Sequence, residues 1–416
     1  MRIAGRHDRY PLSAIRRGTF FLMRRYLLPT GLMLASTATH AQAPREFASG
    51  WKPVAEFFHA GLEREGVVGG TLWFLRGDSV LAREFHGAAD LATGRRVDAN
   101  TIFHWASITK TFTAIAIMQL RDRGRLSLDD PIVKYVPELT AVSNPHGPME
   151  AITIRHLLSH SAGFRNPTWP WGGSQPWHPY EPTEWSQLVA MLPYTQILFP
   201  PGSKYSYSNP GIIFLGRVIE KLSGDDFEVY IDKNIFRPLG MSRSYFDLTP
   251  YHLLADRANN YEVREGKPAA NGLDFDTGIT TSNGGLNAPL TDMARYFGFL
   301  LGGGPGAAGP VPVLKRSSLE EMWRPVLPAS DAEAMGDSIA LSFFVKRAEG
   351  ATLVGHTGSQ RGFRAFFYLH PETRTAMVAA FNTAAAEERP GDHPDIGALR
   401  EGIVSRVVKG VLPLFR

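Results

Sequence analysis

Residues 107–120 have the sequence SITKTFTAIAIMQL, which predicts a buried helix with a chemical site at its start. Ser107 and Lys110 are three residues apart, so on a helix the hydroxyl and the amine lie on one face. The segment stays apolar on nearly every side until Arg121 and Asp122, as is typical of a buried helix. Burial and the positive end of the helix dipole both favour a neutral lysine, which makes Lys110 a candidate acceptor for the Ser107 proton.

A Ser-x-x-Lys spacing arises by chance about once in a chain of this length, so the other polar motifs decide its meaning. Tyr207-Ser208-Asn209 lies in a turn-rich stretch just before the apolar run 211–216, and we expect it on a loop that leads into a helix. Residues 352–355 are predicted to end a strand, with His356-Thr357-Gly358-Ser359 directly after it. Three such motifs in this order indicate one site assembled from distant segments.

With these motifs the chain resembles the penicillin-recognising serine hydrolases, which include class C β-lactamases, DD-peptidases, D-aminopeptidases and related esterases. The resemblance covers roughly residues 48–411 and extends to the segments 103–107, 124–131, 152–163, 238–241 and 282–286. It implies an α/β (α+β) fold of the β-lactamase/transpeptidase type. In this fold, helices flank an antiparallel sheet built from both chain ends, and a mostly helical lobe is inserted.

The resemblance also implies roles for individual residues. Ser107 would be the acylated nucleophile and Lys110 its general base. Tyr207 would transfer protons to the leaving group and in deacylation, while Asn209 would hold the substrate. The backbone N–H groups of Ser107 and Ser359 would hold the oxyanion, a contribution that leaves no side-chain signature in a sequence.

One departure concerns His356, because most β-lactamases have a lysine there. Some DD-peptidases, D-aminopeptidases and esterases of the family carry histidine, so the substitution preserves the fold prediction and weakens the β-lactamase one. Thr357 and Gly358 are expected to bind substrate beside it. Arg361 and Arg364 are candidates to supply the missing positive charge through bidentate contacts; the alternative for both is a solvated strand edge.

Residues 1–43 are predicted to be a cleaved signal peptide, with Met23 as an alternative start. They combine an arginine-rich beginning, an apolar run from 26 to 35 and the small-residue sequence Ala41-Gln42-Ala43. Cleavage removes seven of the 44 basic residues and one of the 40 acidic ones, so the formal net charge changes from +4 to −2. A nucleic-acid partner then has no compositional support. We expect a periplasmic or secreted protein, exported by the general or the twin-arginine route, without a stable membrane span.

Residues 44–416 are predicted to form one catalytic domain. The sheet lobe would comprise about 48–126 and 336–411, with a helix at 54–64, a hairpin of strands 71–75 and 80–85, and strands at 340–346, 363–369 and 375–381. The last helix is expected at about 395–411. Residues 127–335 would form the helical lobe, with the site between the two lobes.

Three other features leave alternatives open. Residues 165–185 hold four of the eight tryptophans, and this loop either packs on itself or lines the substrate cleft. Residues 302–312 are expected to be a flexible connector. His156 and His160 have the spacing of a metal pair, but no acidic residue lies between them, so we expect no metal.

The sequence therefore predicts an exported serine hydrolase that needs no cofactor. It would act on amide or ester bonds of a small-molecule or peptide substrate, with cell-wall peptides and β-lactams among the candidates. The alternative is a penicillin-binding or cell-envelope interaction protein that does not turn over. The set Ser107, Lys110, Tyr207, Asn209 and His356 favours the enzyme, because a decayed site is expected to lose at least one member.

Overall fold

The computed structural model describes residues 43–167, 182–274, 277–304, 313–329, 335–386 and 393–416. Residues 1–42 of the expected leader lie outside the described residues. Residues 168–181 of the tryptophan-rich loop and 305–312 of the expected connector also lie outside them. The leader, the role of the loop and the connector therefore stay predictions.

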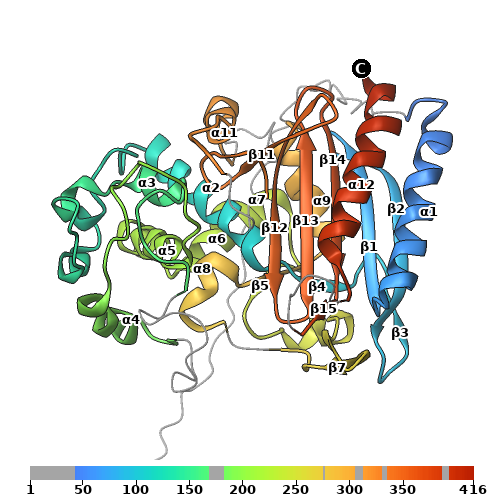
Figure 1. The fold of residues 1–416 in the computed structure, drawn as a ribbon, viewed down its shortest axis with the longest axis horizontal. Helices are drawn as coiled ribbons and strands as arrows, with labels where there is room; N and C mark the ends of the chain where they lie inside the picture. The colour runs from blue at the N-terminus through green and yellow to red at the C-terminus, as the bar shows by residue number, and fades with distance from the viewer. Residues whose placement is uncertain (1–42, 168–181, 275–276, 305–312, 330–334, 387–392) are drawn as a thin grey trace, which may run out of the picture. The chain divides into compact units, whose positions relative to one another are not determined.

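A nine-stranded sheet with the order β3-β2-β1-β14-β13-β12-β11-β10-β9 forms the centre of the fold (Figure 1). Its strands are β1 (Gly69–Arg76), β2 (Ser79–Asp90), β3 (Arg95–Arg96), β9 (Leu327–Pro328), β10 (Ser338–Ile339), β11 (Phe344–Ala348), β12 (Ala351–Gln360), β13 (Phe363–His370) and β14 (Thr375–Phe381). β1 pairs antiparallel with β14, with Trp73 opposite Val378. This pairing confirms the expected antiparallel sheet built from both ends of the chain.

The expected strand 340–346 is wrong in one respect, because a tight turn interrupts it. β10 ends at Ile339 and β11 begins at Phe344, and the N–H of Ala340 donates to the carbonyl of Phe343 at 2.8 Å. Ser342 closes this turn in the left-handed region with φ 58°. A run of apolar residues does not reveal such a turn, because a buried turn and a buried strand have the same hydrophobic pattern.

Each face of the sheet has its own apolar core, because successive side chains along a strand point to opposite faces. Leu72 and Phe74 of β1 pack in one core with α1 (Phe47–Glu65) and α12 (Ile396–Gly410). These two helices lie side by side over the strands in Figure 1, and they contact each other. Trp73 and Leu75 belong to the core on the opposite face.

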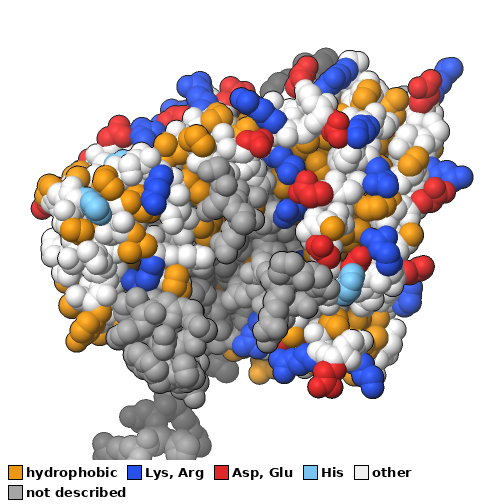
Figure 2. Space-filling model, in the orientation of Figure 1, with side chains coloured by type: hydrophobic (Ala, Val, Ile, Leu, Met, Phe, Trp, Pro, Cys, Tyr) orange, Lys and Arg blue, Asp and Glu red, His pale blue; other side chains and the backbone are white. Residues whose placement is uncertain are grey.

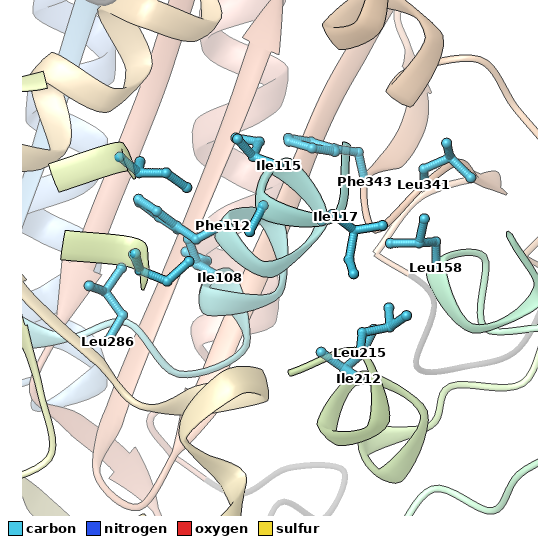
Figure 3. Packing of buried hydrophobic residues seen from close by; sticks show 14 of the residues in the cluster. Ile108, Phe112, Ile115, Ile117, Leu158, Ile212, Leu215, Leu286, Leu341 and Phe343 are labelled. Atoms are coloured by element: carbon cyan, nitrogen blue, oxygen red, sulfur yellow. The ribbon is translucent and has the colours of Figure 1, made fainter. Parts of the chain in front are cut away.

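That second core is built around α2 (Thr109–Asp122), which is buried from Thr109 to Leu120. Figure 3 shows apolar side chains of α2, α5 (Asn209–Ser223) and the turn before β11 converging in one cluster. Ile115 of α2, Leu215 of α5 and Phe343 of the turn are fully buried in it. Because α2 is enclosed in this way, its first turn is held in a fixed place relative to the sheet.

The remaining elements lie mostly between residues 127 and 335. The helices are α3 (Ile154–Leu158), α4 (Trp185–Met191), α6 (Phe227–Ile231), α7 (Arg237–Leu239), α8 (Thr281–Gly284), α9 (Leu290–Leu300) and α11 (Arg316–Met322). Two small sheets have the orders β4-β8-β5 and β15-β6-β7. Their strands are β4 (Ile102–His104), β5 (Tyr245–Phe246), β6 (Tyr261–Arg264), β7 (Lys267–Ala270), β8 (Leu286–Pro289) and β15 (Thr383–Ala385).

Two surface properties bear on partners. Within the described ranges, no helix combines the length and the apolar character needed to cross a bilayer. On the face shown in Figure 2, lysine and arginine side chains are interspersed with aspartate and glutamate over α1 and α12. Neither sign of charge therefore dominates that part of the surface.

Candidate active site

Ser107 lies at the junction between β4 and α2. A single 3-10 turn, η1 (Ala106–Ile108), follows β4, and α2 begins directly after it. Ala106 has a positive φ of 46°, an uncommon conformation for a residue with a side chain. The Nζ atom of Lys110, in the first turn of α2, is 3.0 Å from the Oγ atom of Ser107. The predicted nucleophile and base are therefore within hydrogen-bonding distance.

The surroundings of Lys110 favour a neutral amine. Its side chain is fully buried, and burial holds its pKa well below the usual lysine range. Its second partner is uncharged, because Nζ donates to the backbone carbonyl of Asn283 in α8 at 2.8 Å. No carboxylate within the described ranges forms an ion pair with it. A neutral Lys110 can accept a proton from Ser107, whose side chain is only partly buried.

Tyr207 approaches the same amine from the helical region. It lies on the loop before α5, where the Ser208 hydroxyl accepts the N–H of Gly211 at 3.2 Å and caps the helix. The Nζ atom of Lys110 is 4.9 Å from the centre of the Tyr207 ring. Lys110 therefore contacts both Ser107 and Tyr207, and the structure brings together three residues that are distant in sequence.

Asn209 is the first residue of α5, and asparagines surround it. Its Nδ2 donates to the Oδ1 of Asn166 at 3.2 Å, and its backbone carbonyl accepts the Nδ2 of Asn283 at 3.3 Å. Asn283 therefore links two parts of the site, because its own carbonyl accepts the hydrogen bond from Lys110. The sequence analysis did not identify Asn166, because it lies 43 residues from Asn209 in the chain. It also missed the carbonyl of Asn283, because a backbone acceptor has no residue signature.

The segment His356-Thr357-Gly358-Ser359 lies inside β12, so the expectation that it follows the end of the strand is wrong. The strand extends to Gln360 because β13 pairs with it throughout, with Ser359 opposite Arg364. On the other side, the ladder with β11 stops at Gly355. Residues 356–360 therefore present a strand edge that no neighbouring strand covers among the described residues.

The N–H groups along that edge have a known direction. Thr357 donates its N–H to the sulfur of Met335 at 3.3 Å, away from β13. Alternate residues of a strand direct their N–H groups to the same edge, so the Ser359 N–H points there too. The N–H of Ser107 lies at the start of η1, where helix-type N–H groups have no acceptor within the turn. The direction of both N–H groups agrees with the expected oxyanion role, which stays a prediction.

Gly358 allows β12 to contact the segment that carries Ser107. A Cβ atom at this position would lie 2.2 Å from the carbonyl oxygen of Trp105 and 3.4 Å from the Cβ of Ala106. Only a residue without a side chain permits this approach. The contact fixes the distance between the Ser359 edge and the nucleophile.

His356 is buried and uncharged. Burial, followed by the proximity of Lys110, lowers its pKa to about 3, so the ring is neutral at pH 7. Its Nδ1–H donates to the carbonyl of Thr357 at 2.6 Å, and Phe344 packs against its ring at 5.3 Å between centres. His356 therefore supplies no positive charge for a substrate carboxylate. Arg361 lies in the exposed turn after β12, and its substrate-binding role stays a prediction.

The two histidines with metal-pair spacing have other partners. α3 ends at Leu158, so His156 and His160 do not share a helix face. The Nδ1 atom of His156 accepts the N–H of Thr153 at 3.2 Å, and that of His160 accepts the N–H of Ser208 at 3.1 Å. His160 also stacks on Tyr207, a contact that the sequence analysis missed because nothing local connects the two residues.

A separate cavity of about 240 Å³ lies beside α5, α6 and α8. Its lining includes Arg217, Glu228 and Ser282, but none of the predicted site residues. The candidate catalytic residues Ser107, Lys110 and Tyr207 are therefore not part of the lining of this cavity.

Comparison with known proteins places this geometry in context. Residues 54–400 match the sequence pattern of the β-lactamase family. Penicillin-binding protein 4* of Bacillus subtilis (strain 168) is 30% identical over 329 residues, which cover 75% of this chain and 68% of that protein. Protein flp of Staphylococcus aureus (strain COL) is 25% identical over 321 residues, or 77% of this chain. The match spans only 61% of the length of flp.

Two solved structures have a similar fold. The octameric penicillin-binding protein homologue from Pyrococcus abyssi has a TM-score of 0.71 and 25% identity, covering 87% of this chain and 77% of that one. The D-amino acid amidase from Ochrobactrum anthropi SV3 has a TM-score of 0.70 and 21% identity, covering 88% of this chain and 99% of that one.

Proposed function

The chain belongs to the β-lactamase family and has its β-lactamase/transpeptidase-like fold, and from this premise we propose that it is a serine hydrolase that forms an acyl-enzyme on Ser107. One observation carries the proposal: a fully buried lysine with uncharged partners lies 3.0 Å from a serine hydroxyl. This is the arrangement in which a general base activates a weak nucleophile.

In the acylation step, Lys110 takes the hydroxyl proton while the Ser107 oxygen bonds to the substrate carbonyl carbon. The negative charge passes to the carbonyl oxygen, which accepts hydrogen bonds from the N–H groups of Ser107 and Ser359. The bond to the leaving group then breaks, and Tyr207 gives a proton to the departing amine or alcohol. Lys110 keeps the proton it took from Ser107, so the acyl-enzyme holds a Lys110 ammonium 4.9 Å from the ring centre of a Tyr207 phenolate, and both groups are ready for deacylation.

In the deacylation step, a water molecule attacks the ester carbon and loses its proton to Tyr207. The ester bond breaks, and the Ser107 oxygen recovers a proton from Lys110. Asn209 holds the amide or ester part of the substrate, and the open edge at Thr357 pairs with its backbone. Catalysis then needs no group beyond the residues of this chain.

The neutral His356 favours some substrates over others. A buried uncharged ring does not attract the carboxylate that β-lactams and peptide C-termini carry, so esters and D-aminoacyl amides fit this part of the site better. The D-amino acid amidase from Ochrobactrum anthropi supports this choice by similarity of fold. A substrate with a carboxylate remains compatible if Arg361 binds it.

A second candidate is a protein that is acylated by penicillin and does not turn over. The similarity to penicillin-binding protein 4* favours it. Under this hypothesis, a labelled penicillin stays bound to Ser107 and none of the substrates below is hydrolysed.

The deciding experiment is a substrate panel on the purified mature protein. It contains a p-nitrophenyl acyl ester, a D-aminoacyl anilide, a D-Ala-D-Ala peptide and a cephalosporin. We expect turnover of the ester or the anilide, a mass increase equal to the acyl group on Ser107, and no activity in Ser107→Ala. Ser49→Ala, which changes an exposed serine on α1, serves as the control. A full rate in Ser107→Ala would contradict the proposal.

Export is a separate part of the proposal. The arginine-rich start and the Ala41-Gln42-Ala43 sequence support cleavage near residue 43 and a periplasmic or secreted location. N-terminal sequencing of the protein recovered outside the cytoplasm should begin near Pro44. Recovery of the full-length chain in the cytoplasm only would contradict it.

A further inference from the structure

His160 holds the backbone on both sides of Tyr207. Its carbonyl oxygen accepts the N–H of Ser206 at 2.8 Å, and its ring Nδ1 accepts the N–H of Ser208 at 3.1 Å. Between these two bonds, the imidazole stacks on the phenol ring of Tyr207, with 4.4 Å between ring centres and 25° between planes. One residue therefore contacts three successive positions of the loop that carries Tyr207.

The hydrogen bonds also determine the form of the ring. Because the Ser208 N–H donates to Nδ1, that atom carries no proton, and the neutral ring has its proton on Nε2. A second proton on Nδ1 would face the Ser208 N–H and break the bond. Burial, and then the proximity of Lys110 and His356, keep the pKa of His160 well below its usual range. His160 therefore acts as a fixed acceptor and a stacking surface rather than as a proton carrier.

The conformation of His160 is itself uncommon. It is 1% exposed and has a positive φ of 50°. Such a conformation costs a non-glycine residue free energy and persists only where its surroundings hold it. Here the left-handed turn follows the end of α3 and directs both the carbonyl and the ring of His160 toward residues 206–208.

We propose that His160 is a positioning residue that sets the orientation of the Tyr207 ring relative to Lys110 and Ser107. This inference rests on the proposed function, in which Tyr207 transfers protons. A misplacement of about 1 Å at a reacting group can lower a rate about 100-fold. The two hydrogen bonds and the ring stacking that His160 makes around Tyr207 therefore contribute to turnover.

Two substitutions test separately the hydrogen bond from the Ser208 N–H and the stacking on Tyr207. His160→Asn retains an acceptor near the position of Nδ1 but removes the aromatic ring, whereas His160→Phe retains the ring but leaves the Ser208 N–H without an acceptor. We expect each to lower kcat by about 10- to 100-fold with KM changed less than about 3-fold. His156→Asn is the matched control, because His156 also accepts a backbone N–H through Nδ1 but does not stack on Tyr207. It should leave kcat within about 2-fold.

A double-mutant cycle tests whether His160 acts through Tyr207. If it does, His160→Phe should lower kcat less than about 3-fold when Tyr207 is already phenylalanine. Losses that multiply in the double variant would overturn the proposal. Thermal unfolding of each variant checks that the protein is folded, and His160→Asn carries the test if His160→Phe does not fold.

A second measurement does not depend on activity. In protein labelled with ¹³C-tyrosine, the resonance of Tyr207 is assigned by its loss in Tyr207→Phe. His160→Asn should shift this resonance, because it removes the stacked ring, and His156→Asn should not. An unchanged resonance in His160→Asn overturns the inference. If Ser107→Ala keeps the full rate, the proposed function fails, and this resonance still decides whether His160 positions Tyr207.

Discussion

Gly358→Ala should separate the two halves of the site. In the present structure, a Cβ at residue 358 would lie 2.2 Å from the Trp105 carbonyl oxygen, and real Cβ atoms essentially never come within 3.0 Å of another heavy atom. The difference between these distances requires β12 and the Ser107 segment to move apart by about 0.8 Å. We expect a loss of about 1–3 kcal/mol of stability and about a 100-fold loss of kcat/KM, because the Ser359 N–H moves away from the oxyanion position.

The assay combines steady-state hydrolysis of the p-nitrophenyl ester with unfolding in guanidinium chloride. Gly355→Ala is the matched control, because its Cβ would lie 2.1 Å from the carbonyl oxygen of Phe367 in β13. This clash is as severe and lies in the same strand, but it does not involve Trp105. We expect a similar loss of stability and a much smaller loss of kcat/KM.

The result that refutes this reasoning is a Gly358→Ala variant with lowered stability and unchanged kcat/KM. Equal losses of kcat/KM in the two alanine variants would also refute it, because the loss would then reflect general damage to β12. Structure determination of Gly358→Ala would show the separation directly.

Three further predictions concern buried titratable side chains. Lys110→Arg should abolish turnover, because an arginine stays protonated and cannot accept the Ser107 proton. In the wild type, kcat/KM should fall as the pH drops through the lowered pKa of Lys110, so the acid limb of the pH–rate profile should lie well below the usual lysine pKa range. Burial lowers the pKa of His104 to about 4, so this residue contributes stability that is complete above about pH 6.5 and lost toward pH 4. His104→Asn should therefore remove about 2 kcal/mol from the difference in unfolding free energy between pH 7 and pH 4.5, measured by denaturation at both pH values. Asp292 accepts the Arg243 N–H at 2.7 Å and the Arg295 guanidinium at 2.7 Å while 1% exposed, so Asp292→Ala should lower the free energy of unfolding in urea by about 3 kcal/mol, and an unchanged value would contradict this account.

The sequence predicted those helices and strands whose apolar residues recur at the regular spacing of a helix or a strand. The hairpin of β1 and β2, the buried α2 and the terminal helix α12 all follow from hydrophobic spacing. The strand extension to Gln360 was missed because it depends on pairing with β13, which supplies backbone partners to a polar segment. The turn at Ser342 was missed because its apolar neighbours are buried on either side.

The candidate site was predictable only where side chains form motifs. Ser107, Lys110 and Tyr207 were named from their spacing and from resemblance. The structure places Ser107 and Tyr207 beside the amine of Lys110. Asn283 binds that amine through a backbone carbonyl, and His160 meets Tyr207 across a fold that no local pattern encodes. Such partners follow from tertiary structure alone.

The pairing of β1 with β14 has a consequence for how the protein folds. Strands near the start of the described chain complete the sheet only with strands near its end, so much of the native structure depends on contacts of long sequence separation. Proteins of high contact order fold slowly, because loop closure must precede the contacts that reward it. During synthesis, β1 and β2 leave the ribosome long before β14. The edge of β1 that pairs with β14 therefore stays unpaired until β14 is made. The proposed export suits this order of events if it precedes folding, since Ser107, Lys110 and the edge of β12 then come together only when the sheet is complete.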